Sequence, residues 1–185
     1  MQLKESNIFA VALKEFYFST SEITPLIEEI LKKEKQIKKI SSLYSRHGGI
    51  GEGYYTDYGN PVKLLEYEKL MVMVGNLFAN KNNDFNLNFY WSAFYNRYNL
   101  HDAHNHCTHF LEKPQHNYSS VLYLTQQGHT KFLSPNHCSI DEEIIIKSEV
   151  GKLIIFPSAM FHSGTSTEKG KRIIISSNLG IYRNE

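Results

Sequence analysis

From residue 85 onward the sequence consists almost entirely of short segments with β character, and this feature restricts the fold more than any other. Aromatic and β-branched residues fill these segments, and glycine, proline and asparagine separate them. The connections are too short for the helical crossovers that join parallel strands. The sequence therefore predicts antiparallel sheets that form a sandwich or a barrel-like jelly roll. The expected strands cover residues 85–98, 118–125, 130–133, 143–147, 152–156 and 172–176.

Before residue 85 the signals are mainly helical. Ser19 and Glu22 have the spacing of a capping box, and the apolar residues after them recur at helical intervals, which predicts a helix to about residue 40. Pro61 is a typical first helical residue, and a second helix is expected from there to about residue 79. Residues 7–13 are mostly apolar and indicate a first strand.

The chain of 185 residues is expected to form a single domain, because this length suffices for one hydrophobic core. A polar break at residues 81–84 divides it into a helical support region, residues 1–84, and a β-sheet core, residues 85–185. The Gly-rich segment 48–60 in the first region is expected to be a loop, and a lid over a binding site is one role for it.

Composition argues against several classes of function. The formal net charge is +1, with 20 basic and 19 acidic residues, so the chain has no basic footprint for nucleic acid or for a membrane surface. No apolar run approaches the ~20 residues of a membrane span, and the N-terminus lacks a signal-peptide pattern. Cys107 and Cys138 form neither a disulfide framework nor a Cys-x-x-Cys motif. We therefore expect a cytoplasmic protein.

The segment Asn99–His106 is the most informative about function, because it holds three histidines and one aspartate. Imidazole and carboxylate groups bind borderline transition metals. His104 and His106 are two residues apart, so both rings would point to the same face of an extended strand. Such a pair can share one metal ion, and a further ligand then has to come from another part of the fold.

His162 and Arg172 are candidates for the rest of a site. A buried strand is expected to end at Pro157, and His162 follows it near the mouth of the barrel, where a ligand from a distant strand would lie. Arg172 comes ten residues later (172 − 162 = 10) and opens the next apolar strand. An arginine that points into a strand-built pocket requires an anion, and a guanidinium pairs best with a carboxylate.

Residues 85–180 resemble the iron(II)- and 2-oxoglutarate-dependent oxygenases, in particular a group of small, mostly uncharacterised members from bacteria and marine phages. The resemblance implies a mainly β fold, with a double-stranded β-helix flanked by two or three helices. It also implies an enzyme that uses dioxygen, Fe(II) and 2-oxoglutarate to hydroxylate a substrate. The motifs that carry it are His104-Asn-His106, Ser119-Ser-Val-Leu-Tyr-Leu124, Gly128-His-Thr-Lys-Phe132, Phe156-Pro-Ser-Ala-Met-Phe-His162 and Arg172-Ile-Ile-Ile-Ser-Ser-Asn178.

The resemblance implies that Fe(II) is bound by His104, by His162 and by the residue two positions after His104. That residue is His106 in this chain, whereas the wider superfamily has aspartate or glutamate there. Asp102, two residues before His104, is therefore the alternative to His106 as the remaining ligand.

For the cosubstrate, the resemblance implies that Arg172 holds the distal carboxylate of 2-oxoglutarate. Tyr123 and Thr130 are expected as further residues of that pocket, and His101 and His109 are expected around the metal ligands or at the surface. A small-molecule or peptidyl substrate is expected, and a homodimer is one expected assembly.

Two alternatives remain open. The cupins share the architecture and combine a His-x-His pair and a later glutamate with a Gly-x5-Pro-x-Gly-x2-His motif. Gly151, Pro157 and His162 fit that second motif, although its central glycine is replaced, and a cupin would be a metal-dependent isomerase or dioxygenase without 2-oxoglutarate. This alternative leaves Arg172 unexplained. A non-enzymatic jelly-roll binding domain, the third hypothesis, predicts neither a metal nor a pocket arginine.

Overall fold

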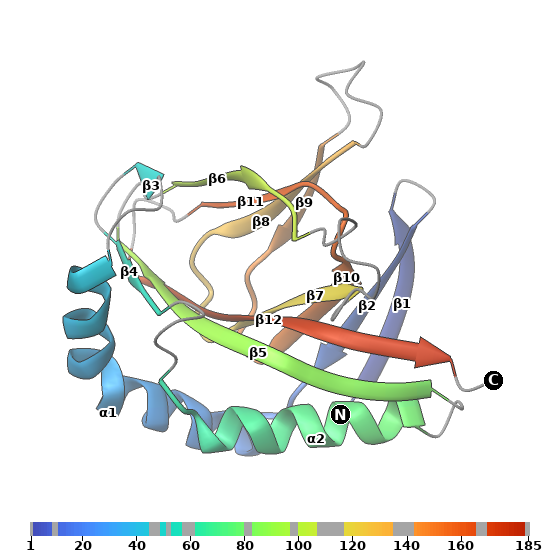
Figure 1. The fold of residues 1–185 in the computed structure, drawn as a ribbon, viewed down its shortest axis with the longest axis horizontal. Helices are drawn as coiled ribbons and strands as arrows, with labels where there is room; N and C mark the ends of the chain where they lie inside the picture. Colours follow the sequence, from blue (N-terminus) through green and yellow to red (C-terminus); the bar gives the residue numbers. More distant parts are fainter. Residues whose placement is uncertain are drawn as a thin grey trace.

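The fold consists of two antiparallel sheets that face one another, with two helices on the outer side of the larger sheet (Figure 1). This confirms the predicted jelly roll, a double-stranded β-helix with flanking helices. Among the described residues, neither helix is long and apolar enough to cross a membrane. The structure, a computed structural model, describes residues 2–8, 11–44, 49–50, 53–56, 62–79, 83–96, 100–106, 117–134, 143–165 and 170–183.

The strands of both sheets follow a fixed order. The larger sheet runs β1 (Gln2–Ile8), β2 (Val11–Tyr17), β10 (Lys152–Pro157), β7 (Tyr118–Tyr123), β12 (Arg172–Arg183), β5 (Asn83–Tyr95) and β4 (Gly53–Tyr55). The smaller sheet runs β3 (Gly49–Ile50), β6 (Leu100–His104), β11 (His162–Thr165), β8 (His129–Leu133) and β9 (Glu143–Lys147). The first 84 residues therefore contribute strands to both sheets.

Most strands after residue 85 lie where the sequence predicts them. β7, β8, β9 and β10 agree with their predicted ranges to within two residues. β12 extends seven residues beyond its predicted end (183 − 176 = 7). The reason is its central position, because β12 pairs with β5 along its whole length and with β7 over residues 174–179.

The single strand predicted over residues 7–13 is wrong in extent, because the structure has two strands here, β1 and β2, paired antiparallel. The sequence did not indicate the second strand, because charged residues interrupt the apolar pattern after residue 13. Glu15 of β2 is buried, and its carboxylate accepts a hydrogen bond from the Tyr17 hydroxyl at 2.9 Å and lies 3.9 Å from Lys152 Nζ. These partners allow a carboxylate in a buried strand.

Helix α1 (Thr20–Tyr44) begins where the capping box predicts. The Ser19 N–H donates to the Glu22 carboxylate at 2.7 Å, and the Glu22 N–H lies 3.4 Å from the Ser19 hydroxyl. Helix α2 (Leu65–Ala79) begins later than the sequence predicts. Residues 62–64 are not helical, and Pro61 lies outside the described residues.

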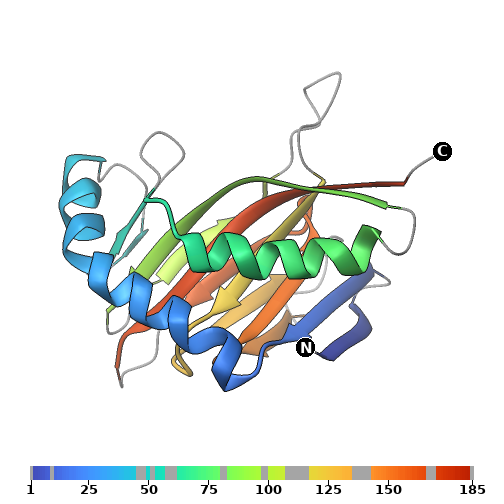
Figure 2. The same ribbon diagram turned by 90° about the horizontal axis from the view of Figure 1, so that it is seen from below.

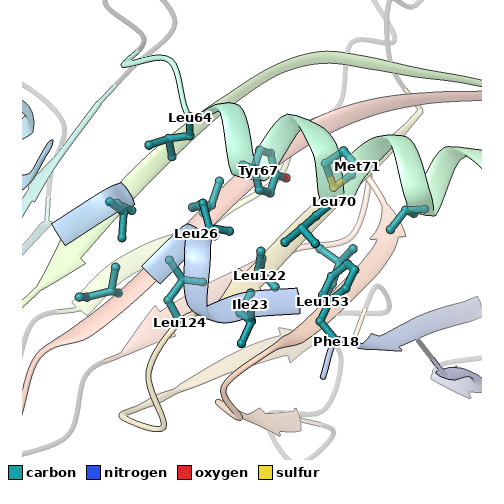
Figure 3. Packing of buried hydrophobic residues seen from close by; sticks show 14 of the residues in the cluster. Phe18, Ile23, Leu26, Leu64, Tyr67, Leu70, Met71, Leu122, Leu124 and Leu153 are labelled. Carbon is teal, nitrogen blue, oxygen red and sulfur yellow. The ribbon is translucent and has the colours of Figure 1, made fainter. Parts of the chain in front are cut away.

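The larger sheet lies between two hydrophobic layers. On its outer side α1 and α2 cross the strands (Figure 2), and Leu26, Tyr67 and Leu122 belong to the large core cluster between helices and sheet (Figure 3). Between the two sheets a second, smaller cluster includes Phe132 and Phe156. The helices therefore stabilise the back of the barrel and leave its interior available for a site.

Glu29 connects the two helices. Its carboxylate accepts hydrogen bonds from the backbone N–H groups of Leu65 at 3.0 Å and Glu66 at 2.9 Å, the first residues of α2, and it pairs with Lys33 Nζ at 2.8 Å. A carboxylate at a helix N-terminus accepts hydrogen bonds from the free N–H groups, and its negative charge interacts favourably with the positive end of the helix dipole. The position of this residue on α1 explains the start of α2 at residue 65.

Replacing Glu29 with alanine should lower the free energy of unfolding by about 2 kcal/mol, because two backbone donors lose a charged acceptor. Burial raises the pKa of Glu29, but hydrogen bonds from Lys33 and from the two backbone N–H groups outweigh this effect and lower it overall. The stabilisation is therefore present above the ordinary glutamate pKa and is lost as the pH falls through the lowered value. Urea unfolding at several pH values measures both effects.

The matched control is Glu28→Ala. Glu28 is largely exposed and lies 3.9 Å from Lys32, so its removal should change the free energy of unfolding by less than about 0.5 kcal/mol. Equal losses for the two variants would show that Glu29 does not cap α2.

Candidate metal centre and anion pocket

Three imidazole rings meet inside one end of the barrel. His104 ends β6 and His162 opens β11, and the two residues pair directly across the smaller sheet. His106 joins them from the segment after β6. One ring nitrogen of each residue lies within 4.8 Å of the others, and the Nε2 atoms of His104 and His106 are 3.1 Å apart. Two ring nitrogens this close require a shared proton or a shared cation.

His106 reaches this position differently from the way the sequence predicts. β6 ends at His104, so the two residues do not share one extended strand. Instead, the backbone N–H of His106 donates to the carbonyl oxygen of Ser158 at 2.8 Å, in the turn before His162. The ring of His106 lies 5.3 Å from the ring of Trp91. Contacts beyond the strand therefore direct this imidazole toward the other two.

Backbone carbonyl groups orient two of the rings. Nδ1 of His104 donates to the backbone carbonyl oxygen of Asp102 at 2.8 Å, and Nδ1 of His162 donates to the backbone carbonyl oxygen of Met160 at 3.0 Å. Because a carbonyl oxygen only accepts, each Nδ1 carries the proton and each Nε2 keeps a lone pair for a metal. Burial lowers the pKa of His104, and it holds the pKa of His162 well below its usual value. Both imidazoles are therefore neutral at pH 7, as metal ligands must be.

Arg172 lines the same cavity and is only 1% exposed. Its guanidinium carbon lies 5.2 Å from the ring centre of Tyr95 and 5.8 Å from that of Tyr123. Nη2 donates to the hydroxyl oxygen of Thr130 at 3.1 Å, and the Tyr123 hydroxyl donates to the same oxygen at 2.8 Å. Among the described residues, Nε and Nη1 of Arg172 have no hydrogen-bond acceptor. A buried cation with two unused donors indicates a site for an anion.

Two glycines leave the space that Arg172 occupies. A Cβ atom on Gly164 would lie 2.6 Å from Nη1 of Arg172. Gly128 has a φ of +81°, and a Cβ atom there would lie 2.0 Å from the Thr165 carbonyl oxygen and 2.7 Å from Cδ of Arg172. A larger side chain at either position would displace the guanidinium group or the neighbouring backbone.

The structure brings most of the predicted site residues to one cavity, but Asp102 is not among them. Its side chain is exposed and does not belong to the group of three ring nitrogens. His101 does line the cavity, with its ring centre 4.3 Å from that of His104. His109, Cys107 and Cys138 lie outside the described residues, so the structure does not test what the sequence predicts for them.

Sequence reasoning missed Tyr95, Gly164 and Trp91, all of which line the cavity. Tyr95 pairs directly with Arg172 across β5 and β12, a relation that only the strand register reveals. Within the Gly-rich segment 48–60, the described residues form the edge strands β3 and β4, which pair with β6 and β5. The other residues of the expected lid lie outside the described part of the chain.

At the level of sequence, no protein-family model and no curated protein matches this chain. Solved structures do match it. A prolyl hydroxylase from Trichoplax adhaerens, in complex with a hypoxia-inducible-factor peptide fragment, has a TM-score of 0.63 and 14% identity, covering 92% of this chain and 83% of that one. A prolyl-4-hydroxylase from Pseudomonas putida has a TM-score of 0.60 and 15% identity, covering 94% and 92%.

HygX from Streptomyces hygroscopicus, with nickel and 2-oxoglutarate bound, has a TM-score of 0.59 and 8% identity, covering 92% of this chain and 83% of that one. At such low identities the likeness shows the fold alone. The fold of this chain is that of the 2-oxoglutarate- and Fe(II)-dependent oxygenases.

Proposed function

We propose that the protein is an iron(II)- and 2-oxoglutarate-dependent oxygenase that hydroxylates its substrate. The observation that carries this proposal is the buried Arg172, which lines the same cavity as the three imidazoles and whose Nε and Nη1 have no hydrogen-bond acceptor among the described residues. An oxygenase of this class needs a metal with open coordination positions and an anchor for a dicarboxylic acid. The cavity contains side chains suited to both tasks.

His104, His106 and His162 would hold the metal. Imidazole suits iron, nickel, copper and zinc, and three-histidine sites with an open position also serve catalytic zinc. The donor set therefore fits Fe(II), while the preference for iron over zinc rests on the oxygenase fold and on Arg172. Three imidazoles give the ion one negative charge less than two imidazoles and a carboxylate do, which alters the reduction potential of the ion.

Arg172 would hold the distal carboxylate of 2-oxoglutarate through Nη1 and Nε, while Thr130 and Tyr123 keep its Nη2 in place. Such a charge-assisted pair satisfies the donors that are otherwise buried without a partner. The cavity has a volume of about 30 Å³, far less than the roughly 300–1,000 Å³ of typical ligand pockets, so lining side chains have to move when the diacid enters. With its distal carboxylate on Arg172, the diacid would turn its other end toward the metal that the histidines would hold.

With Fe(II) and 2-oxoglutarate bound, the site would supply the reaction of dioxygen, 2-oxoglutarate and a substrate C–H bond to give succinate, carbon dioxide and a hydroxylated product. The protein would orient the substrate and exclude water. Trp91, Phe156 and Ile174 line the cavity with apolar surface, which suits both tasks. The peptide in the Trichoplax adhaerens structure supports a peptidyl substrate as one candidate class.

A succinate-release assay tests the proposal. Protein supplied with Fe(II), 2-oxoglutarate and air should release succinate even without added substrate, because enzymes of this class turn over slowly in an uncoupled reaction. The release should stop when a chelator removes the metal. Protein that binds iron but neither binds 2-oxoglutarate nor releases succinate would contradict the proposal and favour the cupin alternative.

A further inference from the structure

β6 and β11 pair irregularly next to the three imidazoles. From the pair His162–His104 to the pair Gly164–His101, β11 advances two residues (164 − 162 = 2) while β6 advances three (104 − 101 = 3). The additional residue in β6 is a β-bulge. In a regular strand, residues three apart point to opposite faces, but the bulge keeps His101 and His104 on the same side. Asp102 and Ala103, between them, are exposed.

The bulge therefore adds a fourth imidazole to the cavity. His101 lines it, and its ring centre lies 4.3 Å from that of His104. Nδ1 of His101 lies 3.3 Å from the carbonyl oxygen of Asp102, the same oxygen that orients His104. Because this oxygen only accepts, Nδ1 of His101 carries a proton, and in the neutral ring Nε2 then has the lone pair. Nε2 of His101 is not part of the metal-binding group of nitrogens.

His101 thus gives the cavity a neutral hydrogen-bond acceptor that the metal and the cosubstrate do not use. A lone pair repels a carboxylate, so this nitrogen does not suit 2-oxoglutarate, whose anchor is Arg172. The remaining described walls combine apolar side chains, such as Trp91, Phe156 and Ile174, with the hydroxyl groups of several serines, and no carboxylate of the described residues lines the cavity. A cationic group would therefore lack a charged partner, whereas a neutral group with a hydrogen-bond donor is matched.

We propose that His101 binds the substrate. Its Nε2 accepts a hydrogen bond from an N–H or O–H group of a neutral substrate and so positions that substrate beside the metal. This inference rests on the proposed function, because it assumes that the histidine triad holds the metal and that Arg172 holds the cosubstrate. It adds the chemical class of the substrate: uncharged at the reacting end and carrying a hydrogen-bond donor there.

Protein loaded with Zn(II) and 2-oxoglutarate tests the proposal without turnover. Long-range 1H–15N NMR should show His101 with a protonated Nδ1 and a free Nε2. The probes are N-methylacetamide and N,N-dimethylacetamide, which differ by one N–H donor. N-methylacetamide should shift the Nε2 resonance of His101 and bind about three- to tenfold more tightly than N,N-dimethylacetamide, the effect of one neutral hydrogen bond. His101→Phe should remove this preference, and His101→Gln, which keeps an acceptor, should retain part of it.

His129→Phe is the matched control. His129 lies on β8 beside Thr165 and is not among the cavity-lining residues, so the preference for N-methylacetamide should remain. Equal binding of both probes to protein that holds Zn(II) and 2-oxoglutarate would overturn the role of His101 and leave the proposed function standing. A zinc-bound Nε2 on His101 would overturn that role too. Failure of the unaltered protein to bind both zinc and 2-oxoglutarate would instead remove the proposed function.

Discussion

Replacing His162 with alanine should abolish metal binding and with it all succinate release. His162 is 6% exposed, and one of its ring nitrogens belongs to the group of three that the fold brings together from two strands and the segment after β6. Two neutral imidazoles remain in the variant, and they are too few donors to hold Fe(II) firmly. Metal content after gel filtration should fall from about one ion per chain to near zero.

The fold should survive this substitution at a cost in stability. The His162 ring packs against Phe156, with ring centres 4.8 Å apart, and its loss leaves a small cavity beside an aromatic core. We expect the metal-free variant to melt cooperatively, with a far-ultraviolet circular dichroism spectrum like that of the metal-free parent. A variant that melts cooperatively and still retains one metal ion per chain would show that His162 is not a ligand.

The same measurement separates His106 from Asp102 as the remaining ligand. His106→Ala should lose the metal, because the His106 ring nitrogen lies 3.1 Å from that of His104. Asp102→Ala should keep it, because the Asp102 side chain is exposed and only its backbone oxygen orients His104. The opposite result would show that the chain rearranges to a site with two histidines and one carboxylate.

Sequence patterns could predict the two sheets because strand signals and short connections follow directly from residue types and their spacing. They could also point to His162 and Arg172 as site residues, since His162 follows the strongly apolar strand β10 and Arg172 opens the apolar strand β12. The second half of β2, residues 14–17, could not be predicted in this way. Its buried Glu15 is compatible with a strand only because Lys152 and Tyr17 lie beside it, and these are contacts of the folded chain.

Contacts that depend on the register of paired strands could not be predicted from the sequence either. Tyr95 contacts Arg172 because β5 and β12 pair at that residue, and Gly164 leaves space for the guanidinium because β11 runs beside it. His101 enters the cavity through a bulge that no spacing rule predicts. Sequence alone therefore identifies candidate ligands more readily than the residues that hold those ligands in place.

The second large effect is expected for Arg172→Met, which should weaken the binding of 2-oxoglutarate by at least about thirtyfold. Loss of one member of a buried, hydrogen-bonded charge pair costs about 2–5 kcal/mol of binding free energy, and each 1.4 kcal/mol is tenfold in affinity. Methionine has a similar length and keeps apolar contact with the rings of Tyr95 and Tyr123. Calorimetric titration of 2-oxoglutarate into the Zn(II)-loaded protein measures the change, and the zinc content should stay the same.

The stability of the same variant distinguishes a binding residue from a structural one. In the protein without cosubstrate, Arg172 carries a buried charge, and its Nε and Nη1 lack an acceptor among the described residues, so its removal should leave the melting temperature unchanged or raise it. Lys171→Met is the matched control, because Lys171 pairs with Glu34 away from the cavity. It should lose some stability and keep its affinity for 2-oxoglutarate. The reverse pattern, with Arg172→Met unstable and its affinity intact, would mean that the guanidinium group serves the fold and that the pocket takes no diacid.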